Sequence, residues 1–332
     1  MSRFASKRTT FVKLFSLGAG MITALTVAQP IAAQTNEFAA KQFVPPTVFQ
    51  AAGPSAASIQ STVDQFRAAL GAVNNGNNPG QASGRREINW DGGSPTNATT
   101  TLTGTPLTTF LNTRGANITT RGSGFVQAPA SGLADTFGNS SYATIFHAFS
   151  PLRLFSPIGS NVSVVEFSVP GSNGNTPATS TGFGVVFTDV DSPDGSRPSD
   201  RTGNRLASTL IEYYGTRGEL LFTSNAPASP GDGNLSFIGV VFSDARVARV
   251  KIIAGDTAPG PNDDRKDIVM MDDFLYGEPT TVYYDERDLQ GAPSKLPLGR
   301  GFPSSPKTLS SGASRGTLCF YAVGQTVHRD FL

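Results

Sequence analysis

Hydrophobic residues alternate with polar or small residues in several short runs between residues 162 and 276. Residues two apart on a β-strand point to the same face of the sheet, so each run should bury one face and expose the other. Turn-forming Gly and Pro residues separate the runs. The pattern predicts an antiparallel all-β fold whose core contains Phe183, Val185, Phe187, Val250 and Ile252.

About ten runs have this character, and Arg249 and Lys251 occupy the polar positions of one of them. A Gly-containing turn between residues 214 and 218 predicts a hairpin. This many short strands favour an antiparallel β-sandwich or jelly roll, with a barrel as the alternative. The predicted strands cover residues 107–111, 117–119, 143–149, 161–169, 181–190, 207–214, 219–222, 237–242, 246–253 and 268–276.

One segment follows the helical period instead. Five apolar residues recur there at intervals of three or four, which predicts a helix over residues 55–73, outside the sandwich. They are Ile59, Val63, Phe66, Leu70 and Val73. We expect residues 34–54 to form a weakly ordered leader and the Gly/Asn-rich residues 74–83 a linker. The sandwich domain is then expected to span residues 84–279.

The first 33 residues have the pattern of a signal peptide. Arg3, Lys7, Arg8 and Lys13 precede an apolar stretch of about 15 residues and a small-residue cleavage site at Ala33. That stretch is short for a bilayer span, although an uncleaved anchor is the alternative. The sequence predicts an exported protein, extracellular, periplasmic or at the cell surface, with no membrane span in the mature chain.

Composition changes this picture in three ways. The 36 Gly and 23 Pro residues suit a turn-rich β-protein, and Cys319 is the only cysteine, so no intramolecular disulfide can form. The chain carries a net charge of +1, but residues 34–279 alone carry −5. An acidic body argues against a nucleic-acid partner. Residues 280–332 are polar and rich in Pro and Ser, which predicts a disordered tail, with an edge strand plus linker as the alternative.

Four segments of the body resemble an uncharacterised bacterial family of secreted β-sandwich proteins, similar to the exported domains of PEP-CTERM-type proteins. The segments are residues 84–92, 181–191, 237–242 and 271–279. A PEP-CTERM sorting tail would show Pro-Glu-Pro, a transmembrane helix and terminal arginines, none of which occurs in residues 280–332. The resemblance implies a fold and a cell-surface context, and no activity.

Catalytic patterns are scarce. Only His147 and His328 are present, and neither lies in a zinc-binding or nucleophile motif. Glycoside hydrolysis needs two carboxylates across a cleft, and four acids on predicted strands are available for it: Glu166, Glu212, Asp272 and Asp273. An extracellular glycan hydrolase is therefore the alternative to a protein without catalytic activity.

Acidic residues also occur where they are depleted, on the strands themselves. Asp189, Asp191 and Asp194 end one predicted strand, and Asp272 and Asp273 lie on another. Carboxylate clusters at strand ends suit Ca²⁺, so we expect a structural calcium ion held by Asp189 and Asp191, with Asp194 or one of Asp272 and Asp273. Solvated turn residues are the alternative.

The function expected from the sequence is a noncatalytic binding or structural module, with extracellular polysaccharide or another cell-surface component as its partner. Trp90, the only tryptophan, is expected to be buried against the first strand, with stacking on a sugar face as the alternative.

Overall fold

The computed structural model describes residues 44–92, 94, 96–191, 209–262 and 266–282, together with two strands at 318–322 and 325–329. The predicted signal peptide, Asp194 and most of the predicted tail lie outside the described residues. No helix in the described part is long and apolar enough to cross a membrane.

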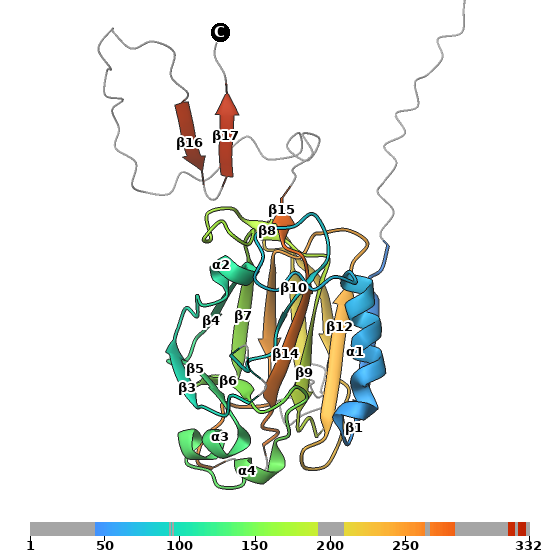
Figure 1. The fold of residues 1–332 in the computed structure, drawn as a ribbon, viewed down its shortest axis with the longest axis vertical. Coiled ribbons are helices and arrows are strands. Elements are labelled where there is room, and N and C mark those ends of the chain that lie inside the picture. Colours follow the sequence, from blue (N-terminus) through green and yellow to red (C-terminus); the bar gives the residue numbers. More distant parts are fainter. Residues whose placement is uncertain are drawn as a thin grey trace, which may run out of the picture. The chain divides into compact units, whose positions relative to one another are not determined.

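The described ranges contain short strands and four helices, and all four helices come before residue 146 (Figure 1). The helices are α1 (Ala56–Leu70), α2 (Leu111–Arg114), α3 (Ala130–Phe137) and α4 (Tyr142–Ile145). The strands are β1 (Thr47–Gly53), β2 (Arg85–Ile88), β3 (Thr101–Gly104), β4 (Ala116–Thr120), β5 (Gly124–Ala128), β6 (Leu154–Ile158), β7 (Val162–Phe167), β8 (Ala178–Thr179), β9 (Gly182–Thr188), β10 (Leu210–Tyr214), β11 (Leu220–Asn225), β12 (Leu235–Val241), β13 (Arg249–Ile253), β14 (Met270–Gly277), β15 (Thr280–Thr281), β16 (Leu318–Ala322) and β17 (Gln325–Arg329).

Two antiparallel sheets form the body. The first has eight strands in the order β1-β12-β9-β14-β6-β5-β3, with β2 pairing β14. The second has five strands in the order β11-β10-β13-β7-β4. Side chains of both sheets meet in one core, which includes all five predicted core residues at 0% exposure. The predicted all-β sandwich is confirmed.

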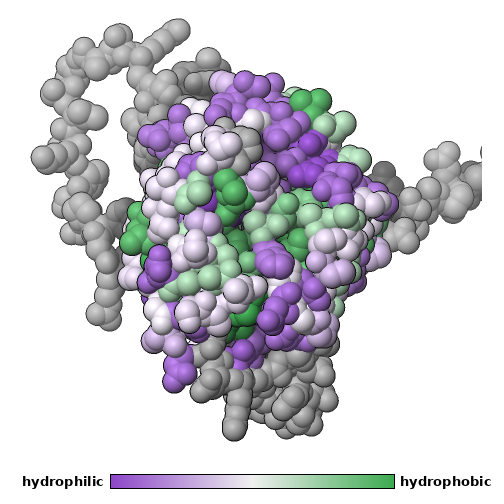
Figure 2. All heavy atoms as spheres, turned by 60° about the horizontal axis from the view of Figure 1, so that its bottom comes forward, coloured by the Kyte–Doolittle hydropathy of each residue, from purple (hydrophilic) through white to green (hydrophobic). Residues whose placement is uncertain are grey.

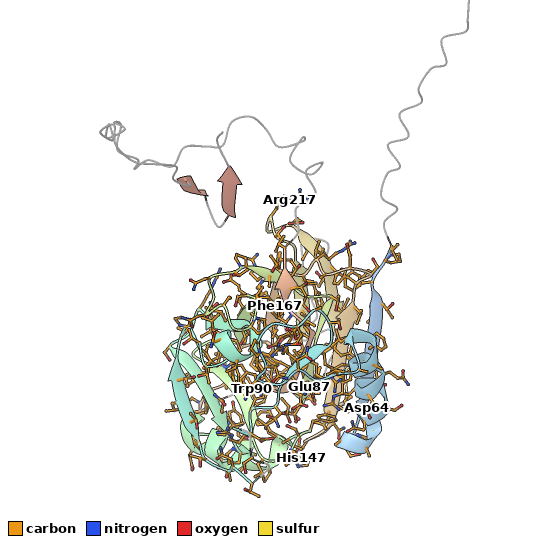
Figure 3. The ribbon with its side chains drawn as sticks, turned by 45° about the horizontal axis from the view of Figure 1, so that its top comes forward. Asp64, Glu87, Trp90, His147, Phe167 and Arg217 are labelled. Atoms are coloured by element: carbon orange, nitrogen blue, oxygen red, sulfur yellow. The ribbon has the colours of Figure 1, made fainter. Side chains whose placement is uncertain are left out.

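Trp90 belongs to this core. Its side chain is 1% exposed, its ring stacks on Phe155 at a centroid distance of 3.7 Å, and its indole N–H donates to the Asp272 carbonyl at 2.9 Å. Figure 3 shows Trp90 and Phe167 inside the body, with Asp64 on α1 at its side. The expected burial of Trp90 is confirmed, and a buried tryptophan cannot stack on a sugar.

Helices cover the outer face of the eight-stranded sheet. Four apolar residues of α1 pack on residues of β9, β12 and β14, while α3 and α4 cover β5, β6 and the start of β14. Gly184 and Gly239 pair across β9 and β12. A Cβ at either glycine would lie within 2.7 Å of the Phe66 ring. Because neither glycine has a side chain, the Phe66 ring of α1 can pack directly on β9 and β12 at these two positions.

The first strand and the helix belong to the body rather than to a separate leader. β1 pairs with β12 over its whole length, from Thr47 to Gly53, as the edge strand of the larger sheet. Its burial pattern contains no fully buried position, which is why its sequence did not indicate a core strand. The expected boundary at residue 84 therefore does not coincide with the start of the sheet.

The Gly/Asn-rich linker is also fixed to the body. Arg86 and Glu278 are both buried and form a bidentate ion pair, with two N–O distances of 2.6 Å. Arg86 donates further hydrogen bonds to the carbonyls of Gly76, Asn78 and Pro79. These bonds satisfy the buried charges and hold the segment against β2 and β14.

Three predicted segments differ in the structure. Residues 143–149, predicted as a strand, form part of α4 and an irregular stretch, because Phe146 packs with residues of α3 and Phe149 packs on the α1 cluster instead of continuing a ladder. Residues 107–111 hold one isolated bridge, at Leu107. In the predicted disordered tail, β16 and β17 pair with each other.

Candidate functional site

The structure divides the predicted metal ligands into two groups. In the β9–β14 ladder, Thr188 pairs with Met270, and the amide of Asp191 donates to the carboxylate of Asp267 at 3.3 Å. Asp272 and Asp273 occupy a bulge between Met271 and Phe274. With a rise of about 3.3 Å per residue, the bulge lies roughly 10 Å along the ladder from Asp189. Asp189 and Asp191 therefore do not share a site with Asp272 and Asp273.

Asp189 lies at the end of β9 in an unusual environment. Its backbone has φ of 70°, a conformation that is rare outside glycine. Its side chain is 7% exposed and its Oδ1 atom has no hydrogen-bond partner among the described residues. Burial, together with the charges of Asp191, Asp232 and Asp267, raises the pKa of Asp189 to about 8.

The sequence did not single out Asp232 and Asp267. Asp267 precedes the last long strand, but its position opposite Asp191 depends on the register of two strands about eighty residues apart. In the part of the chain that the structure describes, no three His, Cys, Asp or Glu side chains converge closely enough to form a metal centre.

Asp272 and Asp273 form a buried carboxyl pair. Neighbouring residues of a regular strand point to opposite faces, but the bulge brings both carboxyls together in a hydrogen bond. Asp272 also accepts hydrogen bonds from the amides of Phe149 and Ser150 at 2.6 and 3.1 Å. Burial raises the pKa of Asp272 well above its usual range and that of Asp273 to about 6.

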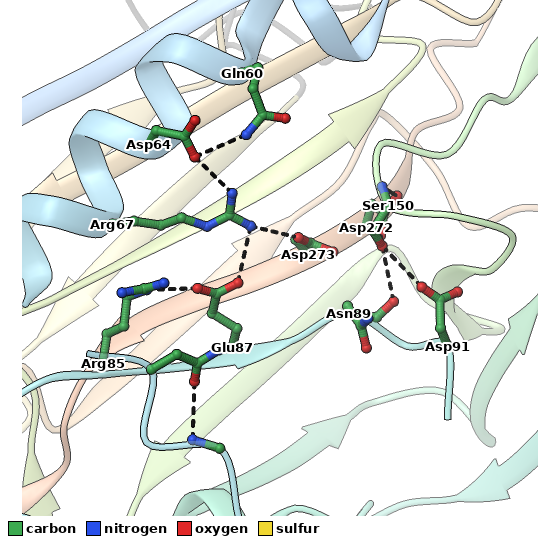
Figure 4. Close-up of polar contacts among 12 residues, drawn as sticks. Gln60, Asp64, Arg67, Arg85, Glu87, Asn89, Asp91, Ser150, Asp272 and Asp273 are labelled. Carbon is green, nitrogen blue, oxygen red and sulfur yellow. Dashed lines mark hydrogen bonds and ion pairs between the residues drawn. The ribbon is translucent and has the colours of Figure 1, made fainter. Parts of the chain in front are cut away.

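This pair belongs to a network that joins α1, β2 and β14 (Figure 4). Arg67 on α1 bonds to Asp64 and Glu87 at 3.0 Å and to Asp273 at 3.4 Å. Ser150 donates to both Asp272 and Asp91. Because Asp272 and Asp273 are 0% and 2% exposed, they are inaccessible to a ligand and fasten the helix to the sheet.

The outer face of the five-stranded sheet has a different character. Among the described helices, α1, α3 and α4 do not pack on it, and α2 contacts only β4 at its border. The outward side chains of Glu166, Glu212, Tyr214, Arg249 and Lys251 are exposed or half-buried, whereas Leu210 and Ile253 at one end of the face are buried. One row runs directly across four strands, from Asn117 on β4 through Glu166 and Arg249 to Tyr214 on β10. We call this surface the open face and define it by the outward residues of β4, β7, β13 and β10.

Two hollows lie on the open face and share Arg249. The larger has a volume of about 660 Å³ and contains Asn117 and Glu166. The smaller has a volume of about 400 Å³ and contains Tyr214 and Lys251. Loops at the end of the sheet deepen the larger hollow. The open face is therefore a polar surface with depressions, which is what a ligand rich in hydroxyl groups can occupy.

Arg249 and Tyr214 form a fixed pair on this face. The Arg249 guanidinium lies over the Tyr214 ring at 4.5 Å from its centroid. The Tyr214 hydroxyl donates to Glu212 at 2.8 Å, and Lys251 bonds to the same carboxylate oxygen at 2.8 Å. Because these contacts restrict the side chains before any ligand arrives, less conformational entropy is lost on binding.

The two accessible carboxylates of this face are far apart. Glu166 pairs with Arg249, and Glu212 with Lys251, so one strand and two residue positions separate the acids. At about 4.8 Å between strands and 3.3 Å per residue, their Cα atoms lie roughly 12 Å apart.

The end of the body at α3 and α4 offers no comparable row of side chains. Figure 2 shows apolar residues at the surface there, interspersed with hydrophilic ones. Comparison of the chain with protein-family models, curated proteins and solved structures found no match.

Proposed function

We propose that this protein is an exported, noncatalytic module that binds extracellular polysaccharide through the open face. The observation that carries the proposal is the asymmetry between the two sheets: helices cover the outer face of the larger sheet, whereas a polar row from Asn117 to Tyr214 crosses the uncovered face of the smaller one. The signal-peptide pattern of residues 1–33 and the resemblance to exported β-sandwich proteins support the extracellular setting.

A polysaccharide suits this face chemically. Asn, Thr, Glu and Tyr side chains provide both donors and acceptors for sugar hydroxyls. An extended chain can follow the flat sheet across both hollows, and the half-buried Tyr214 supplies an aromatic surface. Small-molecule sites are by contrast enclosed and mostly apolar.

The geometry gives less support to the alternative of a glycan hydrolase. The Asp272–Asp273 pair is buried. Such enzymes hold two carboxyl groups about 5–9.5 Å apart across a cleft, whereas the Cα atoms of Glu166 and Glu212 are roughly 12 Å apart and the Glu212 carboxylate is bound by Tyr214 and Lys251. A hydrolase would release reducing ends from a polysaccharide. An assay of reducing sugar over extended incubation tests this, and the proposal predicts no release above the buffer control.

A binding screen tests the proposed function. The intact mature protein should be retarded in native gels that contain its polysaccharide, and Tyr214→Ala should abolish most of the retardation because it removes the ring and releases Arg249. Gln65→Ala, on the exposed side of α1, is the control. Equal retardation of both variants would exclude the open face.

A specific observation also favours a structural cation. We propose that Ca²⁺ binds next to Asp189, with one further carboxylate, that of Asp191, Asp232 or Asp267, and with backbone or water oxygens completing the ligand set, since the buried Oδ1 of Asp189 has no hydrogen-bond partner among the described residues. Binding to the native state alone would stabilise it by about 2.7 kcal/mol at a hundredfold excess over Kd. Identical melting temperatures in calcium and in chelator would contradict it.

A further inference from the structure

Positive charge is concentrated in the smaller hollow of the open face. Its lining contains three cationic side chains, those of Arg121, Arg249 and Lys251, and no carboxylate. The surrounding body is acidic, with a net charge of −5 between residues 34 and 279. Charged residues keep a protein soluble wherever they lie on its surface. Solubility therefore does not explain why three cations lie together in an otherwise acidic protein.

Two of these cations have no acidic partner. The guanidinium groups of Arg121 and Arg249 donate no hydrogen bond to a described residue and form no ion pair with one. The Arg249 guanidinium has one aromatic contact, with the Tyr214 ring. Glu166 pairs with Arg249 across the ladder, yet their charged groups do not come within ion-pair distance. Lys251 has one partner, Glu212.

The Tyr214 ring occupies one face of the Arg249 guanidinium and leaves its N–H edges directed elsewhere. A planar guanidinium donates two parallel hydrogen bonds to a carboxylate or sulfate, which adds both energy and geometric selectivity. Lys251 lies two residues along the same strand, roughly 7 Å away and on the same face. The three cations can therefore contact acidic groups on successive units of an extended polymer.

We infer that the polysaccharide bound by the open face is acidic, carrying carboxylate or sulfate groups, and that Arg249, with Arg121 and Lys251, binds those groups. The inference rests on the proposed function and names its ligand class. Duplex DNA fits less well, because it carries one negative charge per about 1.7 Å of its axis. The carboxylates of Glu166 and Glu212 on the same face therefore repel it more strongly than a polymer whose acidic groups are separated by uncharged sugar units.

Equilibrium binding of the intact mature protein to four polymers tests the inference: polygalacturonate, dextran sulfate, uncharged dextran and duplex DNA. We expect an acidic polysaccharide to bind at least about tenfold more tightly than dextran and DNA, and to weaken from 0.05 to 0.5 M salt through screening. Carboxylate and sulfate sources are distinguished by which of the first two polymers binds more tightly.

Matched variants assign the effect to the hollow. Arg249→Gln should weaken acidic-polymer binding by about tenfold, the effect of losing one charge-assisted contact of about 1.4 kcal/mol. Arg249→Lys, which keeps the charge and loses the planar fork, should fall between Arg249→Gln and the unaltered protein. Lys266→Gln removes an exposed cation that lines neither hollow and should leave binding unchanged. The melting temperature of each variant verifies its folding.

The outcomes separate this inference from the function on which it rests. Equal binding of dextran and acidic polymers that is lost in Tyr214→Ala but retained in Arg249→Gln would overturn the acidic ligand and leave the open face as the binding site. Binding of none of the polysaccharides would overturn both. DNA binding as tight as that of the acidic polymers would replace a polysaccharide with a nucleic acid as the ligand.

Discussion

The two outer faces of the sandwich show how similar strands acquire different roles. In β9 and β14 every residue is buried, because the core lies on one side and α1, α3 or α4 on the other. In β7 and β13, buried residues alternate with half-buried or exposed ones. Strands that are apolar on both sides belong to a covered sheet, whereas alternating strands leave a face for binding. The comparison predicts that substitutions on the covered face affect stability and that those on the open face affect binding.

The largest expected effect is on the covered face. Phe66→Ala should lower the free energy of unfolding by about 3–5 kcal/mol, because the ring is fully buried between α1 and the glycine pair of β9 and β12. Denaturant titration measures it. A loss below about 1 kcal/mol would mean that α1 does not hold the sheet as the structure shows.

A steric change at the same contact should cost less. Gly239→Ala should destabilise the protein by about 1–3 kcal/mol, since its Cβ would lie 2.6 Å from the Phe66 ring. Gly260→Ala is the control, because a Cβ there would meet nothing within 4 Å. Equal stability of the two variants in denaturant would show that the space beside Phe66 is not tightly filled.

The acid network beneath α1 should make stability depend on pH. Burial raises the pKa of Asp273 to about 6, so the folded state holds its proton to higher pH than the unfolded state. The free energy of unfolding therefore falls as pH rises from about 4 to 6. Asp272, whose pKa burial raises further, extends the fall to higher pH. The other charged groups of this network are Asp64, Arg67, Arg85, Glu87 and Asp91.

Asp273→Asn removes one titrating group. The melting temperature of this variant minus that of the unaltered protein should therefore increase as pH rises from 4 to 6.5. Asp64→Asn removes another contact of Arg67, but from a side chain that is 57% exposed, and should follow the unaltered protein. Parallel curves for all three proteins would show that the Asp273 carboxyl releases its proton in both states alike.

The smallest effect on stability is expected on the open face. Tyr214→Ala should lower the free energy of unfolding by less than about 1 kcal/mol, the range of one cross-strand pair on a half-solvated surface. Denaturant titration alongside Phe66→Ala gives the contrast directly. A loss as large as that of Phe66→Ala would remove the distinction between the two faces.

Local patterns predicted those parts of the fold that local chemistry determines. Alternation located β7, β9 and β13 and identified Phe183 and Val250 as core residues, since a buried face repeats at every second position. The sequence pattern did not predict β1, because an edge strand under a helix buries few of its residues. Residues 143–149 were wrongly predicted as a strand because aromatic residues are enriched in strands, whereas Phe146 here packs with residues of α3.

The sites were harder to predict because they depend on register. A one-residue bulge put Asp272 and Asp273 together, and pairing of distant strands put Asp267 opposite Asp191. The sequence did show that Arg249 and Lys251 point away from the core. Neighbours across strands must be known before such residues can be grouped.

Hydrogen–deuterium exchange with and without bound polysaccharide tests the central claim most directly. The account predicts slower exchange in peptides that cover β7, β10 and β13, together with unchanged exchange in α1. Protection confined to α1, α3 or α4, with none on the three strands, would contradict it and place the ligand on the other sheet.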